Sequence, residues 1–171
     1  MRIAVVGNAA GGKTKLSRKL GERYSIGVTH IDSIQFLPGM IIRPHAETIK
    51  TLRTVALKQS WIIDGYGPLD IIEERFLIAD HIIFIDLPVW RHLLWAVKRQ
   101  FENIFKKRAE LPENCNEQKF SHFKKLLKSI WVAHQKMRPE LLKIFNREHL
   151  LPKLIWVRSL SDLKKLSESG I

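Results

Sequence analysis

The stretch GNAAGGKT, residues 7–14, follows the apolar run RIAVV at the start of the chain. It fits the pattern of a glycine, four free positions and Gly-Lys-Thr, which builds a cradle for nucleotide phosphates. In such a cradle, backbone N–H groups and a helix N-terminus converge on the anion. Lys13 is expected to reach the β- and γ-phosphates, and the Thr14 hydroxyl to bind Mg²⁺. The residues expected to bind ATP are Gly7, Asn8, Ala9, Ala10, Gly11, Gly12, Lys13, Thr14 and Lys15.

Because this loop serves kinases, motors and switches alike, the other strand ends must be considered. Asp32, Asp64 and Asp86 each follow an apolar run, and open parallel sheets bind ligands at this carboxyl edge. Asp32 and Asp64 are candidates to hold Mg²⁺ through water or to accept a proton from an acceptor molecule. Asp86, before Leu87-Pro88, is interpreted as a helix cap, and a cap or turn is the alternative for each acid. Gly65, in the turn DGYGP, would let the backbone approach an acceptor, unless the turn is a plain loop.

The elements that must position these side chains alternate along the chain. Short runs rich in Ile, Val and Trp alternate with amphipathic stretches, which predicts an α/β fold with a parallel sheet covered by helices. Strands are predicted at 2–6, 27–31, 60–64, 81–86 and 153–158.

Helices are predicted between these strands and after the last one. They cover 12–24, a stretch from Pro44, short stretches from near Pro68 and after Pro88, 120–145 with a break near Pro139, and the C-terminal SLSDLKKLSES. Trp90, Trp95 and Trp131, at helical spacing among Leu and Val, are interpreted as core residues. The whole chain, 1–171, is expected to form one domain.

The net charge of +12 is concentrated in one segment, because residues 91–147 hold 14 basic and 5 acidic residues. Such a segment could bind nucleic acid, close over the phosphates of a nucleotide, or be a solvated lysine-rich surface. The single cysteine excludes an internal disulfide, and no apolar stretch approaches the roughly 18 residues of a membrane helix. A cytoplasmic protein with no membrane partner is therefore expected.

Further motifs carry a resemblance to a known family. HID follows the second predicted strand, WIIDGYG forms the third, IIFIDLP forms the fourth, and KR, EQKF and MRP come later. With these motifs the chain resembles the adenylate-kinase-like P-loop proteins, and among them the DNA topology modulation proteins. The resemblance implies a three-layer P-loop NTPase fold, with a five-stranded parallel sheet of order 2-3-1-4-5. It also implies a helical lid, at about 99–120, that folds over bound ATP.

The resemblance also implies roles for particular residues. Asp32, Gly65 and Arg75 are expected to bind the acceptor, and basic lid or lid-flanking residues to neutralise the transferring phosphoryl group, with Arg91 a weaker candidate. Guanidinium groups suit this task because they bind phosphate oxygens bidentately and keep their charge in a closed site. The residues expected to take part in catalysis are Lys13, Asp32, Asp64, Arg99, Arg108 and Arg138.

The chain also departs from the family. Ala10 stands where relatives have a glycine, and Gln100, Ile104 and His134 stand where further basic residues are expected. The leading interpretation is a Mg²⁺-ATP-dependent phosphotransferase that acts on a small acceptor. The alternative is an ATP-binding, nucleic-acid-associated regulatory protein with little or no kinase activity, which would use the basic 91–147 segment.

Overall fold

The five predicted strands form one parallel sheet in the computed structural model, which describes residues 1–103 and 120–171. The strands are β1 (Arg2–Gly7), β2 (Val28–His30), β5 (Trp61–Asp64), β6 (His81–Ile85) and β7 (Leu154–Val157). Their order is β2-β5-β1-β6-β7, and every neighbouring pair is parallel. Counted among these five alone, this is the predicted order 2-3-1-4-5. A separate antiparallel hairpin consists of β3 (Phe36–Leu37) and β4 (Ile41–Ile42).

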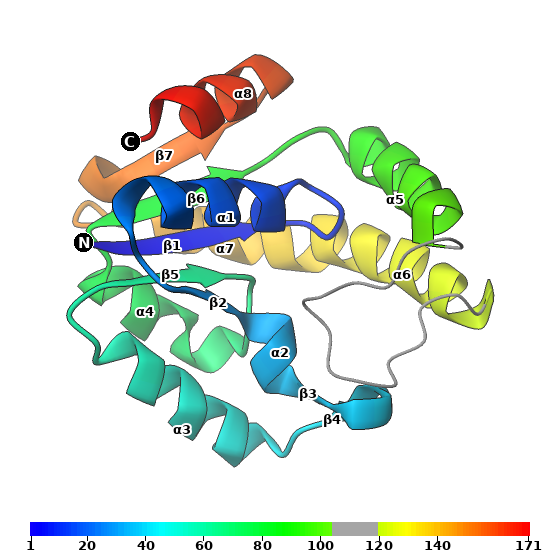
Figure 1. Ribbon diagram of the computed structural model, residues 1–171, viewed down its shortest axis with the longest axis horizontal. Helices are drawn as coiled ribbons and strands as arrows, with labels where there is room; N and C mark the ends of the chain where they lie inside the picture. Colours follow the sequence, from blue (N-terminus) through cyan, green and yellow to red (C-terminus); the bar gives the residue numbers. More distant parts are fainter. Residues whose placement is uncertain (104–119) are drawn as a thin grey trace.

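Helices cover both faces of the sheet (Figure 1). They are α1 (Lys13–Tyr24), α2 (Ile31–Gln35), α3 (His45–Ala56), α4 (Ile72–Ile78), α5 (Val89–Asn103), α6 (Phe120–Val132), α7 (Arg138–Phe145) and α8 (Leu160–Ser169). Short 3₁₀ turns are η1 (Pro38–Met40), η2 (Leu69–Ile71) and η4 (Leu151–Lys153), and η3 (Ala133–Met137) is π-helical. None of the described helices is both long and apolar enough to span a bilayer.

The two faces of β1 belong to two different cores, because successive side chains of a strand point to opposite sides. Ile3 and Val5 pack in a core with Leu16 and Leu20 of α1. Ala4 and Val6 pack in the opposite core, which holds residues of α2, α3, α4 and α7. All four of these β1 side chains are fully buried. The sheet is therefore the middle of three layers, and its carboxyl edge carries the phosphate loop.

The helical segment predicted at 120–145 does not break at Pro139, where a break was predicted. It runs through α6, η3 and α7 without interruption (Figure 1). Pro139 has no N–H to donate to the carbonyl of Gln135, and the helix passes the proline by widening into η3 just before it.

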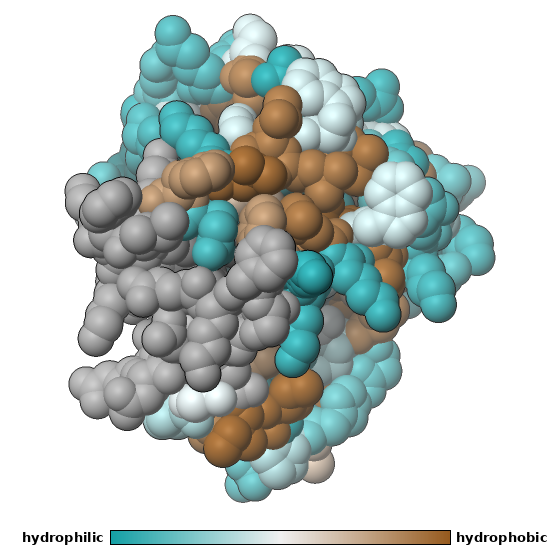
Figure 2. All heavy atoms as spheres, turned by 90° about the vertical axis from the view of Figure 1, so that its right-hand side faces the viewer, coloured by the Kyte–Doolittle hydropathy of each residue, from teal (hydrophilic) through white to brown (hydrophobic). Residues whose placement is uncertain are grey.

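The prediction that three tryptophans lie in the core is wrong for two of them. Trp90 is 51% exposed and Trp131 is 53% exposed. Trp90 belongs to an apolar stripe on α5 that also includes Leu94, Val97 and Phe101, all of them exposed. Figure 2 shows the side of the molecule that lies to the right in Figure 1, and apolar side chains gather in the upper half of that view. Helical spacing among apolar neighbours indicated the stripe but not which way it faces.

Candidate functional site

The loop GNAAGGKT joins β1 to α1, as predicted, and its backbone turns sharply at three positions. Gly7 has φ 149°, Ala10 has φ 53° and Gly12 has φ 84°. A Cβ at Gly7 would lie 2.5 Å from the carbonyl oxygen of Ile85, so this position has no room for a side chain. Ala10 is a non-glycine residue in the left-handed region, which is an unfavourable conformation for an L-residue. The departure noted in the sequence therefore coincides with strain in the loop.

Thr14, the last residue of this loop, is in contact with Asp64 at the end of β5. The Thr14 hydroxyl donates a 2.9 Å hydrogen bond to Oδ2 of Asp64, and Lys13 Nζ donates a 2.9 Å hydrogen bond to the carbonyl of Asn8. The structure thus brings together three of the predicted residues, Lys13, Thr14 and Asp64. The strand pairing explains the meeting, because Asp64 ends β5 beside Val5 of β1, and β1 leads into the loop.

His30 is a member of this cluster that the sequence interpretation missed. Its Nδ1 lies 3.0 Å from Oδ2 of Asp64. His30 ends β2 directly opposite Asp64 in the register of the sheet. A signal for it existed, since the motif HID ends one strand and WIID ends the next in the predicted sheet order.

The carboxylate of Asp64 is buried and only half satisfied. Burial opposes its charge, but hydrogen bonds from His30 and Thr14 and the positive charge of Lys13 outweigh that effect, so the pKa of Asp64 lies below its ordinary value. Both of its hydrogen bonds fall on Oδ2, and the buried Oδ1 has no hydrogen-bond partner. An ionised carboxylate with a free oxygen beside a hydroxyl suits a hard cation such as Mg²⁺. Among the described residues no group of three His, Cys, Asp or Glu side chains gathers as a metal site, so phosphate oxygens and water would supply most ligands of such an ion.

His92 of α5 holds the other side of the loop, and the sequence interpretation missed it as well. Its Nδ1 lies 2.9 Å from the carbonyl oxygen of Ala9, and the residue is only 2% exposed. A Cβ at Gly11 would lie 2.8 Å from the Cε1 atom of this ring. Burial lowers the pKa of His92, and the nearby charge of Lys13 acts in the same direction. The imidazole of His92 is therefore packed against the loop in surroundings that disfavour its charged form.

Asn8 ties the loop to the long helix. Its side-chain amide donates a 2.8 Å hydrogen bond to the carbonyl of Ile130 in α6, and its Oδ1 accepts one from the backbone N–H of Ala9. With His92 on α5, this contact places the loop between the two helices that flank residues 104–119.

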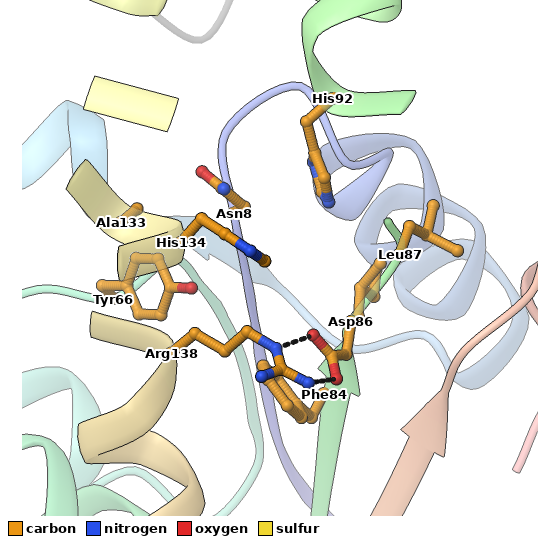
Figure 3. A pocket seen from close by; sticks show the side chains of 10 residues that line it. Asn8, Tyr66, Phe84, Asp86, Leu87, His92, Ala133, His134 and Arg138 are labelled. Carbon is orange, nitrogen blue, oxygen red and sulfur yellow. Dashed lines mark hydrogen bonds and ion pairs between the residues drawn. The ribbon is translucent and has the colours of Figure 1, made fainter. Parts of the chain in front are cut away.

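The prediction that Asp86 caps the following helix is wrong. That helix, α5, begins only at Val89, and Asp86 forms an ion pair with Arg138. Nε and Nη2 of Arg138 donate to the two carboxylate oxygens at 2.7 and 2.9 Å (Figure 3). Trp156 Nε1 donates a further 3.1 Å hydrogen bond to Oδ2 of Asp86. Arg138, expected to stabilise the phosphoryl group, thus has its charge balanced within the fold. The cavity between these side chains, with Tyr66 and His134 on its wall, measures about 10 Å³, which is room for about one water molecule.

The three predicted acceptor residues differ in their position and in their exposure to solvent. Asp32 lies on the exposed first turn of α2, because the helix already begins at Ile31. Gly65 follows Asp64 with φ 124°, a value that favours glycine. Arg75, expected beside the acceptor, is 6% exposed, and its Nη2 donates to the carbonyls of Gly65 and Tyr66, both at 3.0 Å. It supports the turn from the protein side instead of facing solvent at the edge.

The remaining predicted residues lie apart from the cluster or outside the description. Lys15 is exposed on α1. Arg99 belongs to α5, but its side chain is outside the described residues. Arg108 and residues 104–119 of the predicted lid are also outside the described residues. The guanidinium of Arg91 lies 4.6 Å from the ring centre of Trp90.

Comparison with known proteins bears on the fold. No protein-family model matches the chain, and no curated protein matches it in sequence. Among solved structures, the chain is similar to a shikimate kinase from Acinetobacter baumannii in complex with shikimate, with a TM-score of 0.58 and 14% sequence identity. The similarity covers 98% of this chain and 89% of that chain. The chain therefore shares the overall fold of that structure over nearly its whole length.

Proposed function

We propose that the protein is a Mg²⁺-ATP-dependent phosphotransferase that transfers the γ-phosphoryl group to a small acceptor. The observation that carries the proposal is the contact of Thr14 with Asp64, 2.9 Å long, beside Lys13 in a phosphate loop. The free, buried Oδ1 of Asp64 supports it further. The similarity in fold to a shikimate kinase agrees with this chemistry.

Each residue of the cluster has a task that follows from its type. Phosphoryl transfer needs mainly positioning and charge neutralisation, since there is little covalent work for the protein. Lys13 exchanges the carbonyl of Asn8 for phosphate oxygens when nucleotide binds. Mg²⁺, held by Thr14 and by Asp64 directly or through water, would neutralise the charge that develops between the β- and γ-phosphates. His30 keeps the carboxylate of Asp64 ionised and oriented.

The acceptor would lie at the same edge of the sheet. Asp32 on α2 and the backbone of Gly65 remain the proposed acceptor contacts. Arg75 acts there through the carbonyls of Gly65 and Tyr66, and we therefore treat it as a positioning residue. Arg99 and Arg108 stay proposed sources of positive charge for the transferring group, and Arg138 would join them only by leaving Asp86.

A coupled assay of ADP release tests the proposal. The acceptors are nucleoside monophosphates, nucleosides and small hydroxy acids including shikimate, each measured against the ATPase rate without acceptor. One acceptor should raise ADP release, and Lys13→Ala should abolish the increase. If Mg²⁺-ATP stabilises the protein thermally but no acceptor raises the rate, ATP binding stands and phosphoryl transfer is wrong.

The nucleic-acid alternative has one observation in its favour, the exposed rings of Trp90 and Trp131 in the basic 91–147 segment. Aromatic rings beside cations are a common platform for single-stranded bases. A salt titration with an oligonucleotide separates this alternative from the kinase, because release of counterions makes such affinity fall steeply with salt. Absence of binding at low salt would exclude it.

A further inference from the structure

A second cavity lies between α3 and α4, beside the turn that follows β5. Its volume is about 300 Å³. Its walls are mostly aliphatic, formed by Leu52, Ala56 and Leu57 on one side and by Ile71, Ile72 and Ile78 on the other. Residues 7–15, Asp32 and Asp64 do not belong to its lining, so it is separate from the phosphate site.

The size and the lining of this cavity suit a small organic molecule. Ligand pockets of proteins start at about 300 Å³ and are lined predominantly by apolar side chains with a few polar groups. Leu57 is 83% exposed and Ile78 is 39% exposed, so apolar surface at this cavity remains in contact with water. A bound apolar molecule would remove that surface from water, which is favourable.

The charged groups that line the cavity leave one positive charge uncompensated. Arg53 and Glu74 neutralise each other across the two helices through two hydrogen bonds of 3.0 and 2.7 Å. Arg75 also lines the cavity, and in the described part of the chain it forms no ion pair. Its Nε is buried without a hydrogen-bond partner.

A buried guanidinium without a counter-charge is costly. Removing a charge from water costs several kcal/mol unless a partner of opposite charge compensates for it. Burial lowers the pKa of Arg75 to about 10, and the charge of Asp64 acts in the opposite direction from a distance. An anion in the cavity would supply the missing partner within the apolar surroundings.

We propose that this cavity binds a small molecule with an apolar body and one anionic group, whose charge lies against Arg75. Because Arg75 donates to the carbonyls of Gly65 and Tyr66, such a ligand would sit directly behind the turn at the acceptor edge. The proposal does not depend on the proposed function, since it concerns binding and not phosphoryl transfer.

The test uses 2-naphthoate as the probe and its neutral counterpart 2-naphthalenemethanol as the comparison. Calorimetry of the full chain without nucleotide should give one site for 2-naphthoate, and about tenfold or more weaker affinity for the alcohol, as expected for loss of a charge-assisted contact. Methyl resonances of Leu52, Leu57, Ile71, Ile72 and Ile78 should shift with naphthoate. No binding at millimolar concentration, equal affinity for the alcohol, or shifts confined to Leu94 and Val97 of α5 would each overturn the proposal.

Two pairs of variants locate the site. Ala56→Phe fills the cavity from α3, and Ala46→Phe makes the same change on an exposed position of that helix outside the lining. Ile78→Phe and Leu77→Phe form the corresponding pair on α4. The first member of each pair should weaken naphthoate binding about tenfold or more, and the second should not change it. If both lining variants bind naphthoate like the wild type, the cavity is not the site, and the α4 pair decides if Ala56→Phe does not fold.

Discussion

Asp64 ends β5 and Asp86 directly follows β6, the two strands that flank β1, and the two acids have different partners. Oδ2 of Asp64 is hydrogen-bonded to the hydroxyl of Thr14 and to the imidazole of His30, and Oδ1 has no hydrogen-bond partner. Asp86 has both oxygens occupied by the guanidinium of Arg138, and one of them also by the indole of Trp156. Both carboxylates are largely buried, with 4% and 10% of the side-chain surface exposed.

The difference lies in what the surrounding elements bring to each acid. The long helix brings an arginine to Asp86, so this carboxylate is used for tertiary structure. Asp64 has two hydrogen-bonding neighbours. His30 comes from the edge strand of the sheet, and Thr14 comes from the end of the phosphate loop. A carboxylate at a strand end is therefore available to a ligand only where no cation of the fold has already satisfied it.

Asp64→Asn should give the largest effect of this comparison. Loss of the carboxylate removes the charge that would hold Mg²⁺, so turnover should fall by about 10²–10³, or about 3–4 kcal/mol of transition-state stabilisation. The check is kcat in the ADP-release assay, together with the thermal shift caused by Mg²⁺-ATP. Asp86→Asn is the matched control and should keep the Mg²⁺-ATP shift. A loss of less than fivefold for Asp64→Asn would contradict the distinction between the two acids.

Asp86→Asn should instead destabilise the fold. It leaves the guanidinium of Arg138 without its counter-charge, and because that side chain is 36% exposed the cost should be about 1–3 kcal/mol, less than for a fully buried pair. Urea unfolding measures this cost. Adding Arg138→Met to Asp86→Asn should restore part of the stability, since no unpaired charge then remains. A double variant less stable than the single one would show that the ion pair is not the cause.

Gly11→Ala tests the loop that lies between the two acids. The new Cβ would lie 2.8 Å from His92 Cε1 and 3.0 Å from the carbonyl oxygen of Asn8. Overpacking of this kind costs about 1–3 kcal/mol, so ATP affinity should fall about tenfold. Isothermal titration with Mg²⁺-ATP measures it, and adding His92→Ser should recover much of the loss. No recovery would mean that the backbone of Asn8, and not the ring, limits the loop.

The pH dependence of stability should give the smallest of the four effects. The pKa of His92 is lowered by burial, so the unfolded chain binds its proton more readily than the folded chain does. The resulting stabilisation is full above the ordinary histidine value of about 6.5 and is lost as the pH falls below it. The charged groups that act on His92 are Lys13, which lowers its pKa further, and Asp86, which opposes the shift. The free energy of unfolding should therefore drop less between pH 7.5 and 5 in His92→Gln than in the wild type.

Much of the fold and part of the site could be predicted from the sequence. The alternation of apolar runs gave the five strands, because strands buried on both faces need such runs. The spacing in GNAAGGKT predicted Lys13 and Thr14, and the end of WIID predicted Asp64. These signals are local, since each depends on a few neighbouring residues.

The parts that could not be predicted depend on contacts between distant segments. His92 reaches the loop across 83 positions of sequence, and Arg138 reaches Asp86 across 52. Arg75 was expected to bind the acceptor, but its position in the chain says nothing of its burial, and the residue is only 6% exposed. Asp32 was placed at a strand end, but a helix begins one residue before it.

The widened turn η3 sets the angle between the two anchors of the long helix. Ile130 meets the loop through Asn8, and Arg138 meets Asp86, so one helix must aim at two strand ends at once. Each residue of an α-helix advances the chain by about 100° of rotation, and a π-turn closes one residue later. Because the π-turn takes up one extra residue, deleting one residue from 133–137 would give a regular α-helix in which Arg138 still faces its carboxylate. With all residues kept in a regular α-helix, Arg138 would instead be rotated by about 100° away from Asp86. The wide turn thus keeps both contacts of the helix on the same side of it.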